Sequence, residues 1–251
     1  MISANSTLTR AQRWTSSYLW RSNMPLDRPG GVISFSFDDA MHSACAVGRQ
    51  ILERQNCYGT WYIAGGLTDG QIRGRRYHSV SDIQELARGG HHIGCHTYSH
   101  RACDQMTHAE MSLDTQRNAA FFAQSGLPNA TQDFAFPFGA IDITSKRLAA
   151  KTFRSSRLSG GGIQVDQADL NALRTEKLYQ HLFTFDRILS LTKEVAQKGA
   201  WLIFNTHEVT EDPGQWGCTP ALLDYGVQSA LQTGCKVLPI NLAIEYFQSN
   251  V

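Results

Sequence analysis

Short apolar runs alternate with longer amphipathic segments from residue 31 onward, and this alternation restricts the fold more than any other feature. The segments 31–37 (GVISFSF), 44–55 and 58–64 (YGTWYIA) predict strand, helix and strand. The same pattern predicts further helices at 80–88, 107–125, 144–151, 186–198 and 220–233, and further strands at 91–96, 133–137, 153–157, 201–206 and 235–240. About seven such units, with strands too apolar to face water, indicate a parallel sheet covered by helices.

The positions of the reactive side chains favour a closed, distorted (β/α)7-8 barrel over an open doubly wound sheet. Reactive groups of βα folds gather at the carboxyl ends of the strands. Here the strand ends carry Asp38, Asp39, His96, His100, the Pro-Phe-Gly segment 137–139 and His207. A barrel gathers these groups around one mouth, whereas an open sheet would spread them apart. We therefore expect a single α/β domain at 30–251, preceded by an N-terminal arm at 1–29 with a surface helix near 8–18.

Charge and composition exclude some classes of partner. The 251 residues carry 23 Lys and Arg against 22 Asp and Glu, so the net charge of +1 provides no field that would attract nucleic acid or an anionic membrane. No segment approaches the roughly 20 apolar residues of a membrane span, and the first thirty residues lack the apolar stretch of a secretory signal. We therefore expect a cytoplasmic protein whose six cysteines are reduced, mostly buried thiols.

Two histidines and a carboxylate predict a metal site. His96 and His100 are separated by three residues where a strand passes into a loop, and this spacing lets two imidazoles bind one divalent ion. Asp39, at the end of another strand, supplies a carboxylate. Three protein ligands leave positions for water and substrate, as catalytic sites require. Each pair also has an ordinary explanation, because HxxxH pairs occur on surfaces and adjacent acids occur in turns and helix caps.

Four motifs in a fixed order carry a resemblance to a known family. They are SFDD at 36–39, HTYSH at 96–100, FAFPFG at 134–139 and LIFNTH at 202–207. The ordered set, which spans residues 31 to about 240, resembles the NodB-type polysaccharide deacetylases of carbohydrate esterase family 4. The resemblance implies a distorted barrel of seven or eight strands, and a hydrolase that uses a divalent metal to remove acyl groups, usually N-acetyl, from sugars.

The resemblance also implies roles for individual residues. Asp38 matches the family's general base, and the matches to its metal ligands are Asp39, His96 and His100. The implied cofactor is one divalent ion, expected to be zinc, with cobalt, nickel, manganese or iron as alternatives. His207 matches the general acid, since an imidazole can protonate a leaving amine.

The third motif implies an oxyanion donor. The backbone N–H of Phe138 matches a donor to the oxyanion of the tetrahedral intermediate. Pro137, which has no N–H, only sets the direction of the chain.

The chain departs from the family pattern in the same motif. The motif usually begins with an arginine that binds the catalytic base, but this chain has Ala135 there. Arg157, at the end of the next predicted strand, is our candidate substitute, because a guanidinium can hold a carboxylate with two hydrogen bonds. A surface position for Arg157 is the alternative. The aspartate that orients the acid histidine is also not recognisable, and Asp166 and Asp169 are candidates.

His92 stands where many relatives carry glutamate, and it alternates with His91 along a predicted strand. At most one of the two therefore faces the barrel interior, and neither needs to touch metal.

Three aromatic side chains are candidates for stacking on a sugar ring, with ordinary packing as the alternative: Trp216, Tyr98 and Trp61. The leading functional hypothesis is a metal-dependent hydrolase that removes N-acetyl groups from the sugars of a glycan or a glycan precursor, so the expected partner is an acetylated carbohydrate. An O-acetyl esterase, a deformylase or a small-molecule amidase on the same fold is the alternative. A catalytically inactive barrel that binds glycan is a third possibility.

Overall fold

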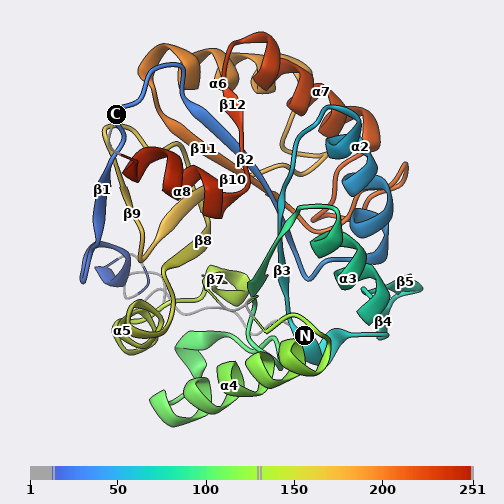
Figure 1. Ribbon diagram of the computed structural model, residues 1–251, viewed down its shortest axis with the longest axis vertical. Helices are drawn as coiled ribbons and strands as arrows, with labels where there is room; N and C mark the ends of the chain where they lie inside the picture. Colours follow the sequence, from blue (N-terminus) through green and yellow to red (C-terminus); the bar gives the residue numbers. More distant parts are fainter. Residues whose placement is uncertain (1–12, 14, 129, 131, 250–251) are drawn as a thin grey trace.

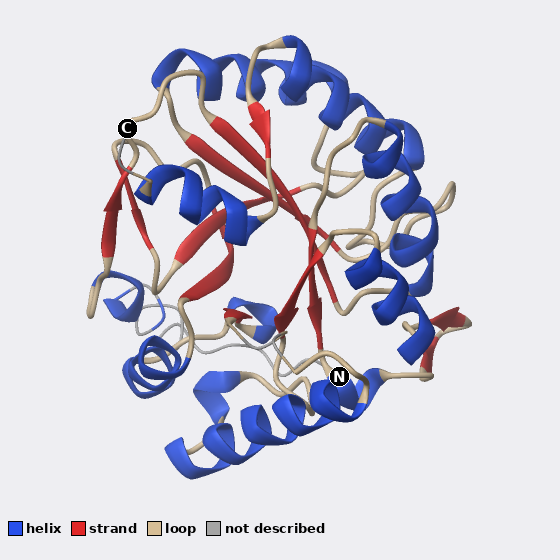
Figure 2. Cartoon of the chain, viewed as in Figure 1, coloured by secondary structure: helices blue, strands red, loops and turns tan. Residues whose placement is uncertain are grey.

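Seven parallel strands close into a barrel in the computed structural model, which describes residues 13, 15–128, 130 and 132–249 (Figure 1). Figure 2 shows the strands in the middle of the molecule with helices around them. The barrel strands are β2 (Val32–Asp38), β3 (Thr60–Ile63), β6 (His92–Cys95), β7 (Asp133–Ala135), β8 (Ser155–Gly161), β10 (Leu173–Lys177) and β11 (Trp201–Thr206). The closed barrel confirms the fold predicted from the alternation.

Strand β2 closes the barrel because it pairs on both sides. It pairs with β11 along its whole length, from Val32 opposite Trp201 to Phe37 opposite Thr206. On its other side, its carboxyl half pairs with β3 and its first two residues pair with the short β12 (Lys236–Val237). The carboxyl end of β2, where the site begins, is therefore held by β11 up to Phe37 and by β3 up to Asp38.

The helices begin at residues that the sequence marks clearly. Ser79 and Thr107 form capping boxes with Asp82 and Glu110, and Thr184 and Thr219 accept hydrogen bonds from the first turns that follow them. The helices are α2 (Arg49–Arg54), α3 (Val80–Arg88), α4 (His108–Gln124), α5 (Ile143–Thr152), α6 (Phe185–Lys198), α7 (Pro220–Gln232) and α8 (Ile240–Gln248). A π-helical turn at Ala44–Gly48 precedes α2.

Side chains on the two faces of β2 belong to two different apolar clusters. Phe35 and Phe37 belong to the larger apolar cluster, which lies between the strands and the outer helices. Val32 belongs to a second cluster with Trp201 and with Phe247 of α8, whose ring lies 5.8 Å from that of Trp201. Because Val32 and Trp201 begin their strands, α8 packs on the amino end of the barrel.

Some elements were missed by the periodicity. Strand β10 (LRTEK) is mostly polar, so its pattern does not resemble the other strands. The predicted strand at 235–240 is only two residues long, and α8 begins at Ile240. Two short antiparallel pairs were also missed. They are the pair of β1 (Asn23–Pro25) with β9 (Gln167–Asp169), which lie far apart in the chain, and the hairpin of β4 (Gln71–Ile72) with β5 (Arg75–Arg76).

The predicted arm lies partly outside the described residues, and this includes most of its predicted helix near 8–18. The domain boundary at residue 30 stays a prediction. All six cysteines are described, and they are buried and free of disulfides. Among the described helices, none has the length and apolar content needed to cross a membrane.

Candidate active site

The two adjacent acids of the first motif face one site because the strand ends between them. Asp38 is the last residue of β2, and Asp39 and Ala40 follow with left-handed φ values of 60° and 47°. A non-glycine residue in this conformation costs about 1–3 kcal/mol, so the surrounding structure must hold it. The buried His78 contributes, because its Nδ1 lies 2.9 Å from the carbonyl oxygen of Asp39.

The second motif begins where β6 ends. The Nδ1 atom of His96 lies 2.7 Å from the carbonyl oxygen of Ala135 on β7, so this nitrogen carries the proton and Nε2 is left as a lone-pair donor. His100 has a φ of 53°, and its N–H donates to the hydroxyl of Thr97. The buried carboxylate of Asp114 accepts two backbone N–H groups of the same loop.

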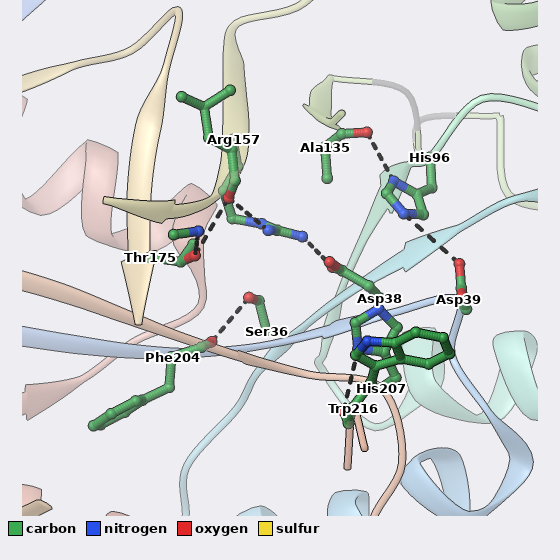
Figure 3. Close-up of polar contacts among 12 residues, drawn as sticks. Ser36, Asp38, Asp39, His96, Ala135, Arg157, Thr175, Phe204, His207 and Trp216 are labelled. Carbon is green, nitrogen blue, oxygen red and sulfur yellow. Dashed lines mark hydrogen bonds and ion pairs between the residues drawn. The ribbon is translucent and has the colours of Figure 1, made fainter. Parts of the chain in front are cut away.

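Three ligand atoms converge where these two motifs meet. The Nε2 atoms of His100 and His96 lie 2.9 Å and 3.7 Å from Oδ1 of Asp39, and the potential ligand atoms all lie within 4.8 Å of one another. Figure 3 shows His96 facing Asp39. Two imidazole nitrogens and one carboxylate oxygen form a donor set that suits zinc and similar divalent ions. The residues present therefore fit a metal ion with three protein ligands.

The charges of the three residues support this interpretation. Burial alone would raise the pKa of Asp39, but His100, with His207 and His96, holds that pKa below its usual value. Burial lowers the pKa of His96 to about 4, which keeps its ring neutral. Burial also opposes protonation of His100, but the neighbouring Asp39 raises its pKa. An ionised carboxylate beside imidazoles is the state in which these groups bind a cation.

Arg157 lies against Asp38. It is fully buried on β8, and its Nη2 donates to Oδ1 of Asp38 from a strand that lies far along the chain (Figure 3). Its Nη1 donates to the carbonyl of Leu158 at 2.9 Å, and its guanidinium stacks 4.7 Å from the ring of Tyr62. The surface alternative for Arg157 is therefore wrong, and the guanidinium occupies the place that Ala135 leaves open.

His207 follows β11 and lies at a cavity. Its Nδ1 lies 3.2 Å from the carbonyl oxygen of Trp216 (Figure 3). A cavity of about 470 Å³ is lined by both residues, together with Asp39, Met41, Ile72, Arg73, Arg75, Tyr77, Glu208, Gly214 and Gln215. The Trp216 side chain is 45% exposed. The predicted acid, a predicted metal ligand and the predicted sugar-stacking tryptophan therefore share one cavity.

The third motif presents a backbone N–H. Pro137 is buried, whereas Phe138 is 64% exposed and has a left-handed φ of 60°. The ring of Phe138 lies 4.7 Å from that of His100. In the described part of the chain, the N–H groups of Gly139 and Ala140 donate to the carbonyls of Phe136 and Pro137, but the N–H of Phe138 donates to no acceptor. This N–H is available to a ligand beside the histidines.

Two sequence expectations need correction. Trp61 cannot contact a sugar, because its side chain is fully buried and its ring stacks 4.4 Å from Phe37 on the helix side of β3. Tyr98, by contrast, is half-buried with Arg117 over one face of its ring, and it does not line the cavity at His207, so a sugar contact by Tyr98 stays a prediction. Asp169 does not orient His207, because its carboxylate accepts from Lys146 and from the N–H groups of Ser22 and Asn171. Asp166, the other candidate, is exposed, and His207 binds the Trp216 carbonyl instead.

The remaining motif residues have structural roles. His92 pairs with Asp133 at 2.9 Å, whereas His91 accepts the N–H of Gly59 and lies on the opposite face of the strand. Cys95 points away from the ligands and accepts a hydrogen bond from Asn118. These positions agree with the alternation expected along a strand.

Several residues at the site were missed by the sequence analysis. His78, Arg75 and Glu208 all act through contacts between segments that lie far apart in the chain. Glu208 directly follows His207, and this adjacency was the only local signal that pointed to it.

Comparisons with known proteins agree with this fold. The model of a family described as polysaccharide deacetylase matches residues 26–153. No curated protein matches the chain significantly. A solved chitin deacetylase from Colletotrichum lindemuthianum shares 15% identity over 87% of this chain and 89% of its own, with a TM-score of 0.63.

Two further solved structures share the fold. The Xyl-CE4 domain of a multidomain xylanase from the hindgut metagenome of Trinervitermes trinervoides shares 15% identity over 88% of this chain and 92% of its own, with a TM-score of 0.61. A family 4 pseudoenzyme from Bacillus anthracis shares 12% identity over 86% of this chain and 66% of its own, with a TM-score of 0.58. The fold alone therefore does not establish catalysis.

Proposed function

The chain belongs to the polysaccharide deacetylase family, and from this premise we propose that it is a metal-dependent hydrolase that removes N-acetyl groups from the sugars of a glycan or glycan precursor. One observation carries the proposal. The ligand atoms of Asp39, His96 and His100 converge beside Asp38, a buried carboxylate that Arg157 holds. A barrel that only bound glycan would not need a buried carboxylate and guanidinium beside these ligand atoms, because burying such groups is costly.

Asp39, His96 and His100 would hold the metal. A divalent ion bound there would polarise the acyl carbonyl and make water nucleophilic at neutral pH. The Nε2 lone pair of His96 is available because the Ala135 carbonyl fixes the ring proton on Nδ1, whereas Nε2 of His100 would give up the proton that it donates to Asp39 when a cation binds. The three side chains therefore need no large rearrangement to bind a cation.

Asp38 would act as the general base. Arg157 binds its Oδ1, so Oδ2 is the atom that takes a proton from the attacking water. The buried guanidinium also fixes the direction of the carboxylate. The free N–H of Phe138 would donate to the oxygen of the acyl group as negative charge develops on it.

His207 would act as the general acid. A carbonyl oxygen can only accept, so the contact with Trp216 keeps a proton on Nδ1 and leaves Nε2 to deliver the second proton. The leaving nitrogen of an amide needs this proton because an amine anion leaves poorly. Trp216, half-exposed at the same cavity, would contact the sugar ring.

The other candidate functions use the same residues on another substrate or do not use them at all. An O-acetyl esterase, a deformylase or an amidase would differ in the leaving group. Acetate release should therefore be measured with N-acetylated chitooligosaccharides and with O-acetylated xylooligosaccharides. We expect the N-acetylated substrates to be hydrolysed faster, and faster release from the O-acetyl esters would favour the esterase.

Metal dependence is tested on the same purified protein. We expect a chelator to abolish acetate release, and zinc or cobalt to restore it. His100→Ala should lower the metal content and reduce acetate release by about 10²-fold or more. His108→Ala, which changes an exposed histidine on α4, is the matched control and should alter neither quantity. Full activity in a protein free of metal would overturn the proposal.

A further inference from the structure

His207 is oriented by a backbone carbonyl. The Trp216 carbonyl oxygen lies 3.2 Å from Nδ1 of His207 and accepts the backbone N–H of the same residue at 3.1 Å. The hydroxyl of Thr206 lies 3.3 Å from that oxygen. A carbonyl has no side-chain torsion of its own, so its position is set by the path of the loop at 212–217. The orientation of His207 therefore depends on what holds this loop.

Glu208 holds the loop from inside. Its side chain is almost fully buried, and its Oε1 accepts the N–H of Gly214 at 2.7 Å. The backbone of Glu208 also accepts the N–H of Cys218 at 3.1 Å. Glu208, which directly follows His207, is thus bonded to Gly214 and to Cys218, which lie on either side of Trp216 in the chain.

Arg75 neutralises this buried carboxylate from a distant segment. It belongs to the hairpin β4–β5, and its Nη1 donates to Oε1 of Glu208. Its Nη2 donates to the carbonyl of Asp212 at 3.1 Å. One guanidinium therefore binds both Glu208 and the start of the loop, and a planar fork of donors suits this double contact.

The glycines of the loop fit around these two side chains. A Cβ atom at Gly214 would lie 2.6 Å from Nη1 of Arg75 and 2.9 Å from Oε1 of Glu208. A Cβ atom at Gly217 would collide with Cγ of Glu208. The loop can follow its path only because these positions lack side chains. This close packing is a second observation, besides the hydrogen bonds, that Arg75 and Glu208 fix the loop.

We propose that Arg75 and Glu208 are positioning residues for the general acid. They fix the loop at 212–217, the loop fixes the Trp216 carbonyl, and the carbonyl holds the Nδ1 proton of His207 so that Nε2 is presented to the leaving group. This inference rests on the proposed function. It assigns to a partly buried ion pair and a carbonyl the task that the sequence analysis sought in Asp166 or Asp169.

The rate loss on substrates with different leaving groups shows whether Arg75 positions the general acid or only stabilises the fold. An amide nitrogen must be protonated to leave, whereas a 4-nitrophenolate leaves without a proton. We expect Arg75→Gln to lower kcat for N-acetylated chitooligosaccharides by about 10- to 100-fold, as loss of an orienting partner typically does. Hydrolysis of 4-nitrophenyl acetate should fall far less, and Arg75→Lys should recover part of the amide activity.

Arg76→Gln is the matched control on the same hairpin. Arg76 is exposed and makes no ion pair or side-chain hydrogen bond to 208–217 in the described residues. We expect this variant to keep both activities. Equal losses on the amide and the ester in Arg75→Gln would overturn the inference, as would an unchanged amide rate. If Arg75→Gln does not fold, the same amide and ester rates are measured with Glu208→Gln, which retains an acceptor for the N–H of Gly214.

A second measurement requires no substrate. Nitrogen NMR of the His207 ring should show the Nδ1–H tautomer in the unmodified protein and a mixture of tautomers in Arg75→Gln. Identical tautomer populations in both proteins would overturn the inference. An unmodified protein with this tautomer but without deacetylase activity would instead count against the proposed function alone.

Discussion

Arg157, a candidate partner of Asp38 in the sequence, is buried against that carboxylate, which excludes the alternative of a surface position. Its guanidinium reaches Asp38 from β8, whereas the arginine of the family pattern would stand at Ala135 on β7. Strands β7 and β8 are neighbours and Ala135 pairs with Arg157, so the charge has moved by one strand at the same level of the barrel. A small side chain at Ala135 leaves room for this arrangement, and the Ala135 carbonyl still orients His96.

Removal of Arg157 should affect both stability and catalysis. Arg157→Gln leaves the buried carboxylate of Asp38 without its partner, so we expect the free energy of unfolding to fall by about 3–5 kcal/mol. We expect kcat for acetate release to fall by about 10- to 100-fold. Denaturant titration and initial rates with the metal-loaded protein measure the two effects.

Arg154→Gln separates these effects, because Arg154 also pairs with a buried carboxylate, that of Asp133, away from the candidate base. This control should lose stability and keep most of its kcat. Equal kcat values in the two variants would show that Arg157 does not orient Asp38.

At the scale of elements, the site is built where strands pass into loops, and the spacing between strands is as important as the loop residues. Strand β6 lies so close to β3 that a Cβ atom at Gly94 would lie 2.6 Å from the ring of Tyr62. The same ring stacks on the guanidinium of Arg157. Gly94 therefore links the spacing of two strands to the orientation of Asp38.

Gly94→Ala should disturb this spacing. We expect a loss of about 1–3 kcal/mol in the free energy of unfolding, because the added methyl group overpacks a filled interior. We also expect a lower kcat, since displacement of Tyr62 moves Arg157. Adding Tyr62→Leu should restore part of the stability, and a double-mutant cycle of urea titrations measures this coupling. Strictly additive losses would show that the two residues do not compete for space.

At the scale of the whole molecule, buried histidines make stability depend on pH. Burial lowers the pKa of His91 to about 4, and Nδ1 of its ring accepts the N–H of Gly59, so the folded protein holds it neutral. The unfolded chain binds a proton near pH 6.5, and between about pH 6.5 and 4 it therefore binds more protons than the folded state. The stabilisation is complete above this window and is lost as the pH falls through it.

Replacement of His91 should flatten this profile. We expect the free energy of unfolding to fall with pH less steeply in His91→Gln than in the unmodified protein, by about 2 kcal/mol between pH 6.5 and pH 5. Glutamine keeps an acceptor for Gly59 but does not titrate. The comparison isolates His91 from His78 and His96, whose pKa values burial also lowers. Parallel profiles for the two proteins would contradict the assignment.

The barrel, most of its helices and strands, and the reactive residues at the strand ends could be predicted from the sequence alone. These follow from local periodicity, capping residues and apolar strands, which are properties of neighbours in the chain. Strand β10 was missed because it is mostly polar, and the β1–β9 and β4–β5 pairs were missed because their strands are only two or three residues long. The side-chain directions of Trp61 and His91 follow from strand alternation, but only the closed barrel showed which face was inside.

How the site is held together depends on contacts that the closed barrel creates. Arg157 was a candidate partner of Asp38, but the sequence left its surface alternative open. The Trp216 carbonyl at His207 and the Arg75 pair with Glu208 were not predicted, because they use a backbone atom or join segments that lie far apart. Every residue has a carbonyl, and a buried arginine has the same letter as an exposed one. Contacts of this kind leave no local trace in a sequence, because they depend on which strand ends the closed barrel brings together.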